Sequence, residues 1–556
     1  MSKLELIYQQ LCSLPASELL SIHPNDLAAS GFQLPGSWKG WWEWATSIDD
    51  EHTPCFPRWM SILHYYSVTS DDQRTGNQVP SNKSSIPPDL KMLIDDIVCI
   101  QLNRDLVAIG NTSESGNAHR SYGMSPKKEH EVSRMSEYID RLLCPGFADT
   151  LHHVVDVGSG QGYLSRALQN LGIHVLALDS NEIQTSGAER WKAKEAARMQ
   201  KQLKMGKDTQ VPDSHHHFND PLFQSHVATS VPSASTASKN IIHSHMGSLT
   251  HQTTCINPRT LESSIHNWLF SGEDNQIAGC TSMIGDLLVD GTEQRTPEEK
   301  PVPVMMVALH ACGSLTPDVL RAFLSNHRRP SAPDVRIWTA QALVVVGCCY
   351  NLMALEDFPL SRSLRERTPV ATLPLTSRHL AAQIPCQWLR NETSARKTSL
   401  AIRKVVFRAL LQPVLGLIGA REASANHTAT PSSYNVEELR GAGQTPENRR
   451  LGKLPDAAYK DWETFLPVYI HDKHRRRQLE SALSVLHVLR CIMGPLIESL
   501  ILLDRHEWIR EELSQSSEAQ ESSVMDVGLV NLFDQATGSG RNVAIVIKPR
   551  EWPNMI

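Results

Sequence analysis

The stretch Val154–Leu164 reads Val-Val-Asp-Val-Gly-Ser-Gly-Gln-Gly-Tyr-Leu and decides the fold class of this chain. An apolar run ends at Asp156, three glycines follow at alternate positions, and a helical pattern begins at Tyr163. The pattern predicts a strand, a tight glycine-rich loop and a helix N-terminus. Because glycine has no Cβ and tolerates positive φ, such a loop lets a ligand approach bare backbone. The helix start adds unpaired N–H groups and the positive end of the helix dipole.

The spacing of the three glycines narrows the choice of ligand. A dinucleotide site has the pattern Gly-x-Gly-x-x-Gly, whereas this loop has Asp-x-Gly-x-Gly-x-Gly. The observed pattern resembles the first motif of class I S-adenosylmethionine (SAM) methyltransferases, in which the loop passes the methionine part of SAM. Next, Ile173–Asp179 is predicted to be a second strand that ends in an acid. An acid about 20 residues after the loop suits a ribose contact; a solvated strand end is the alternative.

Composition and charge place limits on the class of protein. The chain has 556 residues, of which 40% are hydrophobic and 21% are charged, and its formal net charge is −6. The length suggests about two to four domains, and the negative charge excludes attraction of the whole molecule to nucleic acid. Two local basic runs, His471–Arg477 and Arg396–Arg408, are interpreted as solvated helix faces, with nucleic-acid contact as the alternative.

The cysteines and the N-terminus bear on the cellular compartment. The 11 cysteines are odd in number and scattered, which indicates a reducing compartment rather than a disulfide framework. Residues 1–20 lack the basic, apolar and small-residue segments of a signal peptide. Because we find no apolar run of about 20 residues, no membrane span is expected. The sequence therefore predicts a cytoplasmic or nuclear protein with no membrane partner.

Hydrophobic periodicity predicts an α/β fold built on a Rossmann-like sheet. Apolar strands alternate with helices, which favours a mostly parallel sheet with right-handed crossovers. Two β-like runs at the C-terminus predict an antiparallel hairpin, so a helical insertion would interrupt the sheet before its last two strands. The predicted strands are 154–157, 173–179, 279–288, 303–310, 341–347, 525–533 and 542–547.

The same patterns divide the chain into parts. Polar stretches rich in Ser, His, Thr, Gly and Pro are predicted to be loops or disordered segments. A tryptophan cluster near the N-terminus (Trp38, Trp41, Trp42 and Trp44) is interpreted as aromatic packing, with base stacking as the alternative. The parts are an N-terminal helical region (1–108), a linker (109–123), the sheet-bearing core (124–355) with a disordered insertion (about 205–260), a helical insertion (356–523) with a disordered stretch (about 420–452), and the terminal hairpin (524–556).

Four motifs together carry a family resemblance. They are Met124–Val132, the loop Asp156–Ser165, Leu-His-Ala-Cys-Gly at Leu309–Gly313, and Val-Gly-Cys-Cys-Tyr at Val346–Tyr350. With them, the chain resembles the methyltransferase-like protein 25 family, which includes proteins labelled ribosomal RNA adenine dimethylase domain-containing. The resemblance implies a SAM-binding Rossmann-like domain with methyltransferase activity. It leaves RNA, protein and small molecules open as the methyl acceptor.

The segment after the fourth strand bears on the acceptor. Adenine N6 dimethylases resemble one another in an Asn-Leu/Ile-Pro-Tyr segment that holds the exocyclic amine and stacks on the base. Here the corresponding place is Leu309–Gly313, which contains no Asn-Pro-aromatic set. The sequence therefore disfavours an adenine-N6 reaction.

Ligands of open α/β sheets lie beyond the carboxyl ends of the strands, and the cofactor is expected there. Asp156 would organise the loop and the amino group of SAM, Asp179 would hold the ribose, and Asp286 would meet the adenine amine or be an ordinary loop acid. Lys127 shares a helix face with Glu131; they would close over the SAM carboxylate, hold an acidic substrate group or form a solvated cap. The predicted SAM-binding residues are Lys127, Asp156, Gly158, Ser159, Gly160, Gly162, Asp179, Asp286 and His310.

Methyl transfer requires a positioned nucleophile and, where needed, a base that takes its proton. The candidate catalytic residues are His310, Tyr350 and Asn351. His310 ends an apolar strand and is the predicted general base, with a hydrogen-bonded core histidine as the alternative. Tyr350 and Asn351 are predicted to shape the acceptor pocket.

Cysteines near the strand ends raise the question of a metal. Cys312, Cys348, Cys349 and His310 are residue types that suit zinc, but they lack a Cys-x-x-Cys pair and two of them are adjacent. The sequence analysis therefore predicts no metal and interprets these cysteines as small buried apolar filler.

Two other functions compete with methyl transfer. A non-catalytic scaffold could keep the fold or the affinity for SAM, because a fold does not by itself establish chemistry. A nicotinamide oxidoreductase would require the Gly-x-Gly-x-x-Gly spacing that this loop lacks.

Overall fold

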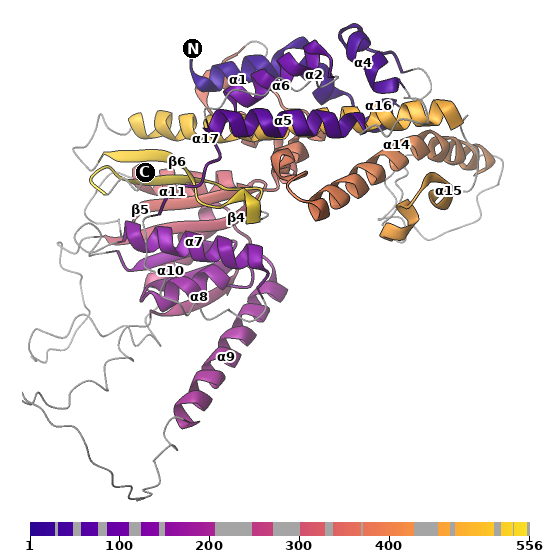
Figure 1. The fold of residues 1–556 in the computed structure, drawn as a ribbon. Coiled ribbons are helices and arrows are strands. Elements are labelled where there is room, and N and C mark those ends of the chain that lie inside the picture. Colours follow the sequence, from indigo (N-terminus) through magenta and orange to yellow (C-terminus); the bar gives the residue numbers. More distant parts are fainter. Residues whose placement is uncertain are drawn as a thin grey trace, which may run out of the picture.

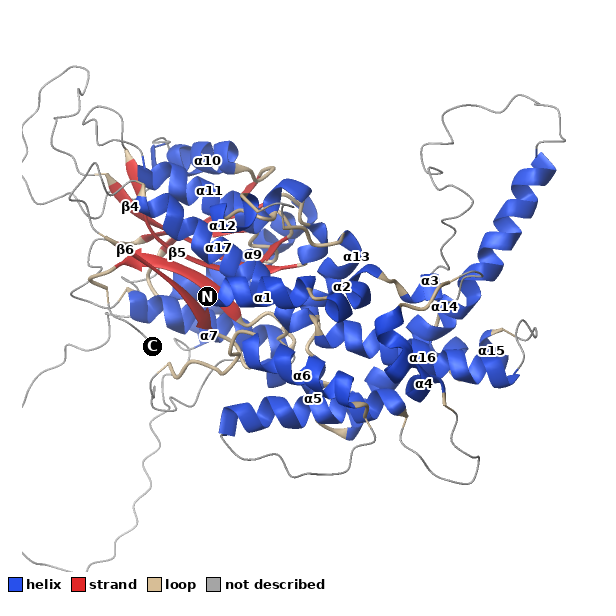
Figure 2. Cartoon of the chain, turned by 90° about the horizontal axis from the view of Figure 1, so that it is seen from above, coloured by secondary structure: helices blue, strands red, loops and turns tan. Residues whose placement is uncertain are grey.

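The computed structural model combines a sheet covered by helices with an elongated body of helices, which lies above the sheet in Figure 1 and extends away from it in Figure 2. Both parts draw on segments that are far apart in the sequence. The structure describes residues 1–27, 32–47, 57–75, 86–109, 124–143, 151–205, 247–270, 301–328, 337–367, 371–426, 454–466, 473–515, 524–537 and 539–552.

Seven strands form one sheet in the order β3-β2-β1-β4-β5-β7-β6. The pairs from β3 to β5 are parallel, and β7 runs antiparallel to both β5 and β6. The predicted fold class is therefore confirmed, including the antiparallel C-terminal pair. The strands are β1 (His153–Val157), β2 (His174–Asp179), β3 (Leu249–Thr253), β4 (Val302–Cys312), β5 (Trp338–Cys348), β6 (Met525–Asn531) and β7 (Val543–Pro549).

The apolar strands are buried because both faces of the sheet are covered. In β4, Met305 and Val307 join the hydrophobic cluster on one face, and Val304 and Met306 join the cluster on the other face. Successive side chains of a strand point to opposite faces, so a continuous apolar run is what a sheet covered on both sides requires. Helices α7 and α8 supply side chains to the first cluster, and α10, α11 and α17 supply them to the second.

Helix α8 begins at Tyr163, as predicted, and other helices also lie next to the sheet. A serine side chain caps α7, because Ser125 Oγ accepts the backbone N–H of Lys128 at 3.3 Å. These helices are α7 (Pro126–Leu142), α8 (Tyr163–Asn170), α9 (Glu182–Met205), α10 (Pro258–Phe270) and α11 (Leu315–Arg328).

The third strand differs from its prediction. It is Leu249–Thr253, inside the stretch that was predicted to be a disordered insertion, while the predicted strand at 279–288 lies outside the described residues. Only Leu249 of β3 is buried, so its sequence carries no apolar alternation to detect. The strand forms because it pairs with β2 along the edge of the sheet, from Val175↔Leu249 to Asp179↔Thr253, and strand preference depends on such context.

The N-terminal region and the helical insertion form one body with one core. Buried side chains from Leu4 to Val98 and from Tyr350 to Ile501 belong to a single hydrophobic cluster. Its helices are α1 (Lys3–Cys12), α2 (Leu14–Ser21), α3 (Pro24–Leu27), α4 (Lys39–Thr46), α5 (Arg58–Thr75), α6 (Pro88–Ile100), α12 (Arg362–Arg365), α13 (Leu375–Arg378), α14 (Glu392–Asn426), α15 (Trp462–Phe465), α16 (Lys473–Ile492) and α17 (Gly494–Ser514). Short 3-10 segments are η1 (Gly36–Trp38), η2 (Tyr350–Leu352), η3 (Leu355–Asp357), η4 (His379–Ala382), η5 (Pro385–Gln387), η8 (Asp456–Tyr459) and η9 (Gln535–Thr537).

Tryptophans near the N-terminus pack together. The rings of Trp38 and Trp41 lie 5.0 Å apart between centroids, and both side chains are buried in the helical core. This arrangement confirms the packing interpretation of the cluster.

Helix α14 lies in the predicted helical insertion and includes the basic run Arg396–Arg408, which was interpreted as a helix face. Its 35 residues extend to Asn426, past about residue 420, where a disordered stretch was predicted to begin. Pro413 lies inside it, and proline ordinarily marks a helix break. The helix is stabilised by its contact face, because Ile402, Val406 and Leu410 are buried in the shared core at helical spacing.

Helix α17 connects the two parts of the molecule. Its first half supplies Leu496 and Leu500 to the helical core, and its second half supplies Trp508 and Ile509 to one face of the sheet. Among the described residues, Lys473–Ser514 is long and apolar enough to span a membrane by length and composition alone. Its most apolar window is 94% buried inside the protein, as expected for the central helices of a core.

Candidate functional site

The glycine-rich loop connects β1 to α8. Gly158, Gly160 and Gly162 have φ values of 75°, 54° and 67°, a region that L side chains rarely adopt. The backbone N–H groups of Gly158 and Ser159 donate to the carbonyl oxygen of Leu178 at 2.8 and 2.9 Å, which ties the loop to β2. A Cβ added at Gly160 would meet no atom within 4 Å. Gly160 therefore presents bare main chain to open space, whereas an added Cβ at Gly158 or Gly162 would meet a neighbouring side chain at 2.9 Å.

Asp179 at the end of β2 faces this loop. Its Oδ2 accepts the backbone N–H of Gly160 at 2.8 Å, and its Oδ1 accepts the N–H of Asn181 at 2.8 Å. Each carboxylate oxygen can accept more than one hydrogen bond, so these contacts orient the group and leave acceptor capacity. The loop and the acid thus lie together as their spacing predicts.

Asp156 lies beneath the loop rather than on its surface. Its side chain is buried, and its Oδ2 accepts the hydroxyl of Ser165 at 2.6 Å. Burial raises the pKa of Asp156 to about 6, against the opposing effect of the hydrogen bond from Ser165. The predicted role in organising the loop fits this geometry. The predicted contact with the amino group of SAM does not, because the carboxyl group is only 1% exposed.

His310 stands at the carboxyl end of β4, as predicted. Its φ is 73°, one of two positive values at non-glycine residues among the described part of the chain. The pairing register of β4 with β5 shifts between Leu309 and Ala311, on either side of it. Such strained residues persist where the surrounding structure holds them and are typical of functional sites. The imidazole is 30% exposed, so it is open to a ligand.

A buried carboxylate holds the imidazole in place. His310 Nε2 lies 3.0 Å from Glu131 Oε2 on α7. Glu131 Oε1 accepts the hydroxyl of Ser539 at 2.6 Å and lies 3.7 Å from Lys127 Nζ. Burial of Glu131 raises its pKa, but the hydrogen bonds from His310 and Ser539 outweigh burial, and the pKa is below its usual value. The ionised carboxylate favours the tautomer with a proton on Nε2, which leaves Nδ1 as the proton acceptor.

Tyr350 and Asn351 do not share this position. Tyr350 is 1% exposed, its hydroxyl donates to Glu498 Oε1 on α17 at 3.0 Å, and burial raises its pKa. The ring packs inside the helical core, which does not favour a place in an acceptor pocket, and the predicted role of Tyr350 stays a prediction. Asn351 lies in η2 with an exposed side chain, and its predicted role in the pocket stays a prediction.

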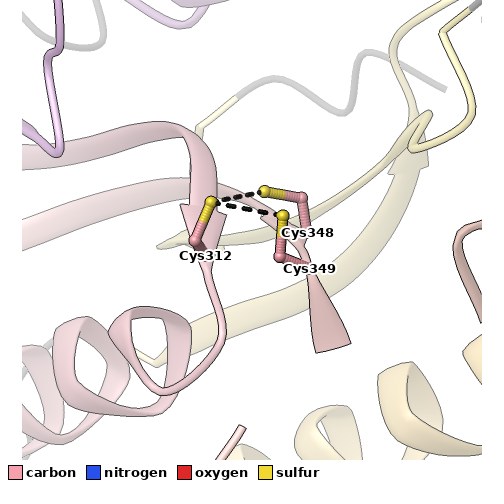
Figure 3. Close-up of side chains that lie close together, drawn as sticks. All are labelled: Cys312, Cys348 and Cys349. Carbon is pink, nitrogen blue, oxygen red and sulfur yellow. Dashed lines mark hydrogen bonds between the residues drawn. The ribbon is translucent and has the colours of Figure 1, made fainter. Parts of the chain in front are cut away.

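Three cysteines gather where β4 and β5 end (Figure 3), and Cys312 lies two residues after His310. Cys312 Sγ lies 3.0 Å from Cys348 Sγ and 3.6 Å from Cys349 Sγ. Cys348 is buried, Cys349 is partly exposed and Cys312 is exposed. The filler interpretation holds for Cys348 alone, because the other two sulfur-bearing side chains reach solvent.

One predicted site residue falls outside the described residues, and one residue of the observed site was not predicted. Asp286 is outside the described residues, and the strand beside β2 ends at Thr253. Ser539 was missed because it meets Glu131 across a separation of 408 residues, which no local pattern signals. The predicted sharing of a helix face by Lys127 and Glu131 is confirmed.

Comparisons with known proteins agree with this geometry. A family described as a methyltransferase domain matches residues 127–356. The Homo sapiens protein named "Probable methyltransferase-like protein 25" is 25% identical over 526 residues, which cover 82% of this chain and 80% of that protein. The Mus musculus protein of the same name is 24% identical over 493 residues, which cover 76% of this chain and 75% of that protein. No solved structure matches. The chain is therefore similar to the proteins named methyltransferase-like protein 25, and residues 127–356 match a methyltransferase domain.

Proposed function

We propose that this protein binds SAM over the loop Gly158–Gly162 and transfers its methyl group to an acceptor at the end of β4. One observation carries the proposal: the open space at Gly160 adjoins a carboxylate that the same residue orients. Bare backbone beside an acid is what a nucleoside with a charged tail requires, because the main chain can approach closely and the acid can accept two hydroxyls.

The residues of the loop fit the parts of SAM. The main chain around Gly160 would hold the methionine part, and Asp179 would accept the ribose hydroxyls. The adenine would lie toward the end of β3, because β3 is the neighbour of β2 on the side away from β1. Lys127 is partly exposed near Glu131 and would meet the carboxylate of the cofactor.

His310 would act as the base that takes a proton from the methyl acceptor. SAM supplies an electrophilic methyl group, and the protein positions the nucleophile and takes its proton. With Nε2 held by Glu131, Nδ1 of His310 would accept a proton from the acceptor. A base oriented by a second group is the general arrangement for activating a nucleophile. RNA, protein and small-molecule acceptors all remain candidates for this position.

Calorimetry tests the binding half of the proposal. SAM is titrated into the full chain and into Gly160→Arg and Asp179→Ala, and both variants are expected to lose binding. Gly36→Arg and Asp140→Ala are matched controls, because Gly36 also faces open space and Asp140 is exposed on α7. Binding of SAM to both site variants at the wild-type affinity would refute the site.

Transfer of a labelled methyl group tests the catalytic half. The protein is incubated with labelled SAM and separate RNA, protein and metabolite fractions, and one fraction is expected to gain label. Label in no fraction, together with normal SAM binding, would identify the alternative function, a non-catalytic SAM-binding or scaffold protein.

A further inference from the structure

The cysteine group at the ends of β4 and β5 has the form of a metal site. Cys312 and Cys348 are direct partners in the parallel pairing, and Cys349 follows the end of β5. All three Sγ atoms lie within 4.8 Å of one another, and Figure 3 shows the three side chains converging from the two strands. In tetrahedral zinc sites with Zn–S bonds of about 2.3 Å, sulfur atoms lie about 3.8 Å apart. Cys312 and Cys349, at 3.6 Å, are close to that spacing. Cys312 and Cys348, at 3.0 Å, would move apart by about 0.8 Å to bind an ion.

The backbone explains how adjacent cysteines face one point. In an extended strand the side chains of Cys348 and Cys349 would point to opposite faces of the sheet. Cys349 instead has a φ of 49°, and this left-handed turn brings its sulfur to the side of Cys312. Glycine would adopt this conformation without strain, so a residue with a side chain here is unusual for a simple turn. Strained positions of this kind are typical of sites where a side chain is used.

Zinc binding at this group would be coupled to loss of the thiol protons, because zinc binds thiolates and each cysteine must release its proton to become a ligand. Cys312 is exposed and Cys349 is partly exposed, so an ion can reach the three sulfur atoms from solvent.

We propose that Cys312, Cys348 and Cys349 bind a zinc ion through three thiolates and leave its fourth position open. Among the described residues, no other His, Cys, Asp or Glu joins this group, and Cys312 opens to solvent. Structural zinc sites have four protein ligands, whereas sites that exchange a ligand have three. The open position would take water or a soft donor such as a thiol. The ion would lie beside His310, at the mouth of the proposed methyl-transfer site.

Zinc content tests the proposal directly. The full chain is purified, dialysed against metal-free buffer and analysed by elemental mass spectrometry, and about one zinc ion per chain is expected. Cys312→Ser and Cys349→Ser are expected to contain at least tenfold less zinc per chain than the wild type. Cys255→Ser, which removes an exposed cysteine outside the group, is expected to retain it. Circular dichroism of each variant checks that the fold is intact.

Cobalt substitution identifies the ligands. Replacement of zinc by Co²⁺ is expected to produce thiolate-to-cobalt absorption in the wild type and in Cys255→Ser, and to lose it in Cys312→Ser. Absence of zinc from the wild type after it is loaded with excess ion, or unchanged zinc in the two site variants, would overturn the proposal. A mass 2 Da below that of the reduced chain, mapped to Cys312 and Cys348, would identify a disulfide pair instead.

The proposed zinc site and the proposed SAM site can be tested independently of each other. SAM binding is measured by calorimetry on the same zinc-loaded samples and on Cys312→Ser. Zinc without SAM binding would refute the proposed function and support the metal site. SAM binding without zinc would support the proposed function and overturn the metal site.

Discussion

At the scale of single residues, the site depends on how a few polar side chains are held. Glu131 is buried in α7, yet it meets a histidine, a serine and a lysine. Each contact satisfies part of the hydrogen-bonding capacity of the buried carboxylate. Burial of this charge without partners would cost free energy. The result is an imidazole with a defined tautomer at the end of β4.

Glu131→Gln tests the role of this carboxylate. The amide cannot hold the Nε2–H tautomer of His310 as a carboxylate does, so kcat for methyl transfer should fall by about 100-fold or more. The Kd for SAM should not change, because Glu131 is not part of the proposed cofactor contact. Steady-state kinetics over a range of pH, with calorimetry, measures both quantities.

A matched control is Glu137→Gln on the same helix, where Glu137 pairs with Arg141 at 3.0 Å. This variant should keep wild-type kcat. An unchanged kcat and pH profile in Glu131→Gln would show that His310 does not need its partner and is not the oriented base.

Asp156 predicts a pH dependence of stability. Its pKa is raised from 3.8 to about 6 by burial, so the folded state binds a proton that the unfolded state releases between these pH values. The free energy of unfolding therefore falls as pH rises through this window and is level above it. The change corresponds to about 3 kcal/mol.

Asp156→Asn removes this titration while it retains an oxygen that can accept from Ser165. The difference in unfolding free energy between wild type and variant should shift by about 3 kcal/mol against the wild type from pH 4 to pH 7. Urea denaturation at several pH values measures the difference. A constant difference across the range would mean that Asp156 is ionised in the folded protein throughout.

At the scale of elements, α17 connects the helical body to the sheet through buried charge. Arg104 Nη1 lies 2.9 Å from Glu498 Oε2, and the Tyr350 hydroxyl donates to Glu498 Oε1 at 3.0 Å. Burial raises the pKa of Glu498, and the positive charge of Arg104 opposes this. The ring of Tyr350, which the sequence analysis placed in an acceptor pocket, therefore belongs to a buried contact with Arg104 and Glu498. We call these three residues the Glu498 joint.

Substitutions at this joint should affect stability rather than chemistry. Glu498→Ala leaves the charge of Arg104 buried without its partner and should destabilise the fold by about 3–5 kcal/mol. Tyr350→Phe loses one hydrogen bond and should cost about 1 kcal/mol. Thermal unfolding with a methyl-transfer assay measures both effects. Loss of transfer in Tyr350→Phe at an unchanged unfolding midpoint would restore the catalytic role.

At the scale of the whole molecule, the N-terminal region cannot be separated from the helical insertion. The guanidinium of Arg490 on α16 is 1% exposed and donates to the carbonyl oxygens of Leu19, Leu20 and Ile22. Removal of the N-terminal helices would remove these acceptors from a buried cation and expose the remaining side of the shared core. The sequence analysis treated residues 1–108 and 356–523 as two separate parts because they are separate along the chain. In the structure, side chains from both segments form one hydrophobic core.

A chain that begins at residue 124 should therefore fail to fold. Deletion of residues 1–123 should abolish cooperative unfolding and cause aggregation, because one side of the helical core is missing. Co-expression of residues 1–123 as a separate chain should restore solubility. A monomeric, cooperatively unfolding 124–556 fragment would contradict the single-core arrangement.

The sequence by itself determined the features that depend on neighbouring residues. The turn through Gly158–Gly162, the acid Asp179 and the buried strands follow from glycine conformation and from apolar runs. These patterns extend over only a few neighbouring residues, so the sequence alone is enough to predict them. The family resemblance rests on the same local motifs.

Only the tertiary structure decided the contacts between distant segments. Glu131 contacts His310 across a separation of 179 residues. Strand β3 forms at the edge of the sheet, although its polar sequence does not predict a strand. The cysteines converge because parallel pairing aligns Cys312 with Cys348 and a left-handed turn redirects Cys349. Such partners are chosen by sheet order and helix packing, and these depend on burial over the whole chain rather than on local preference.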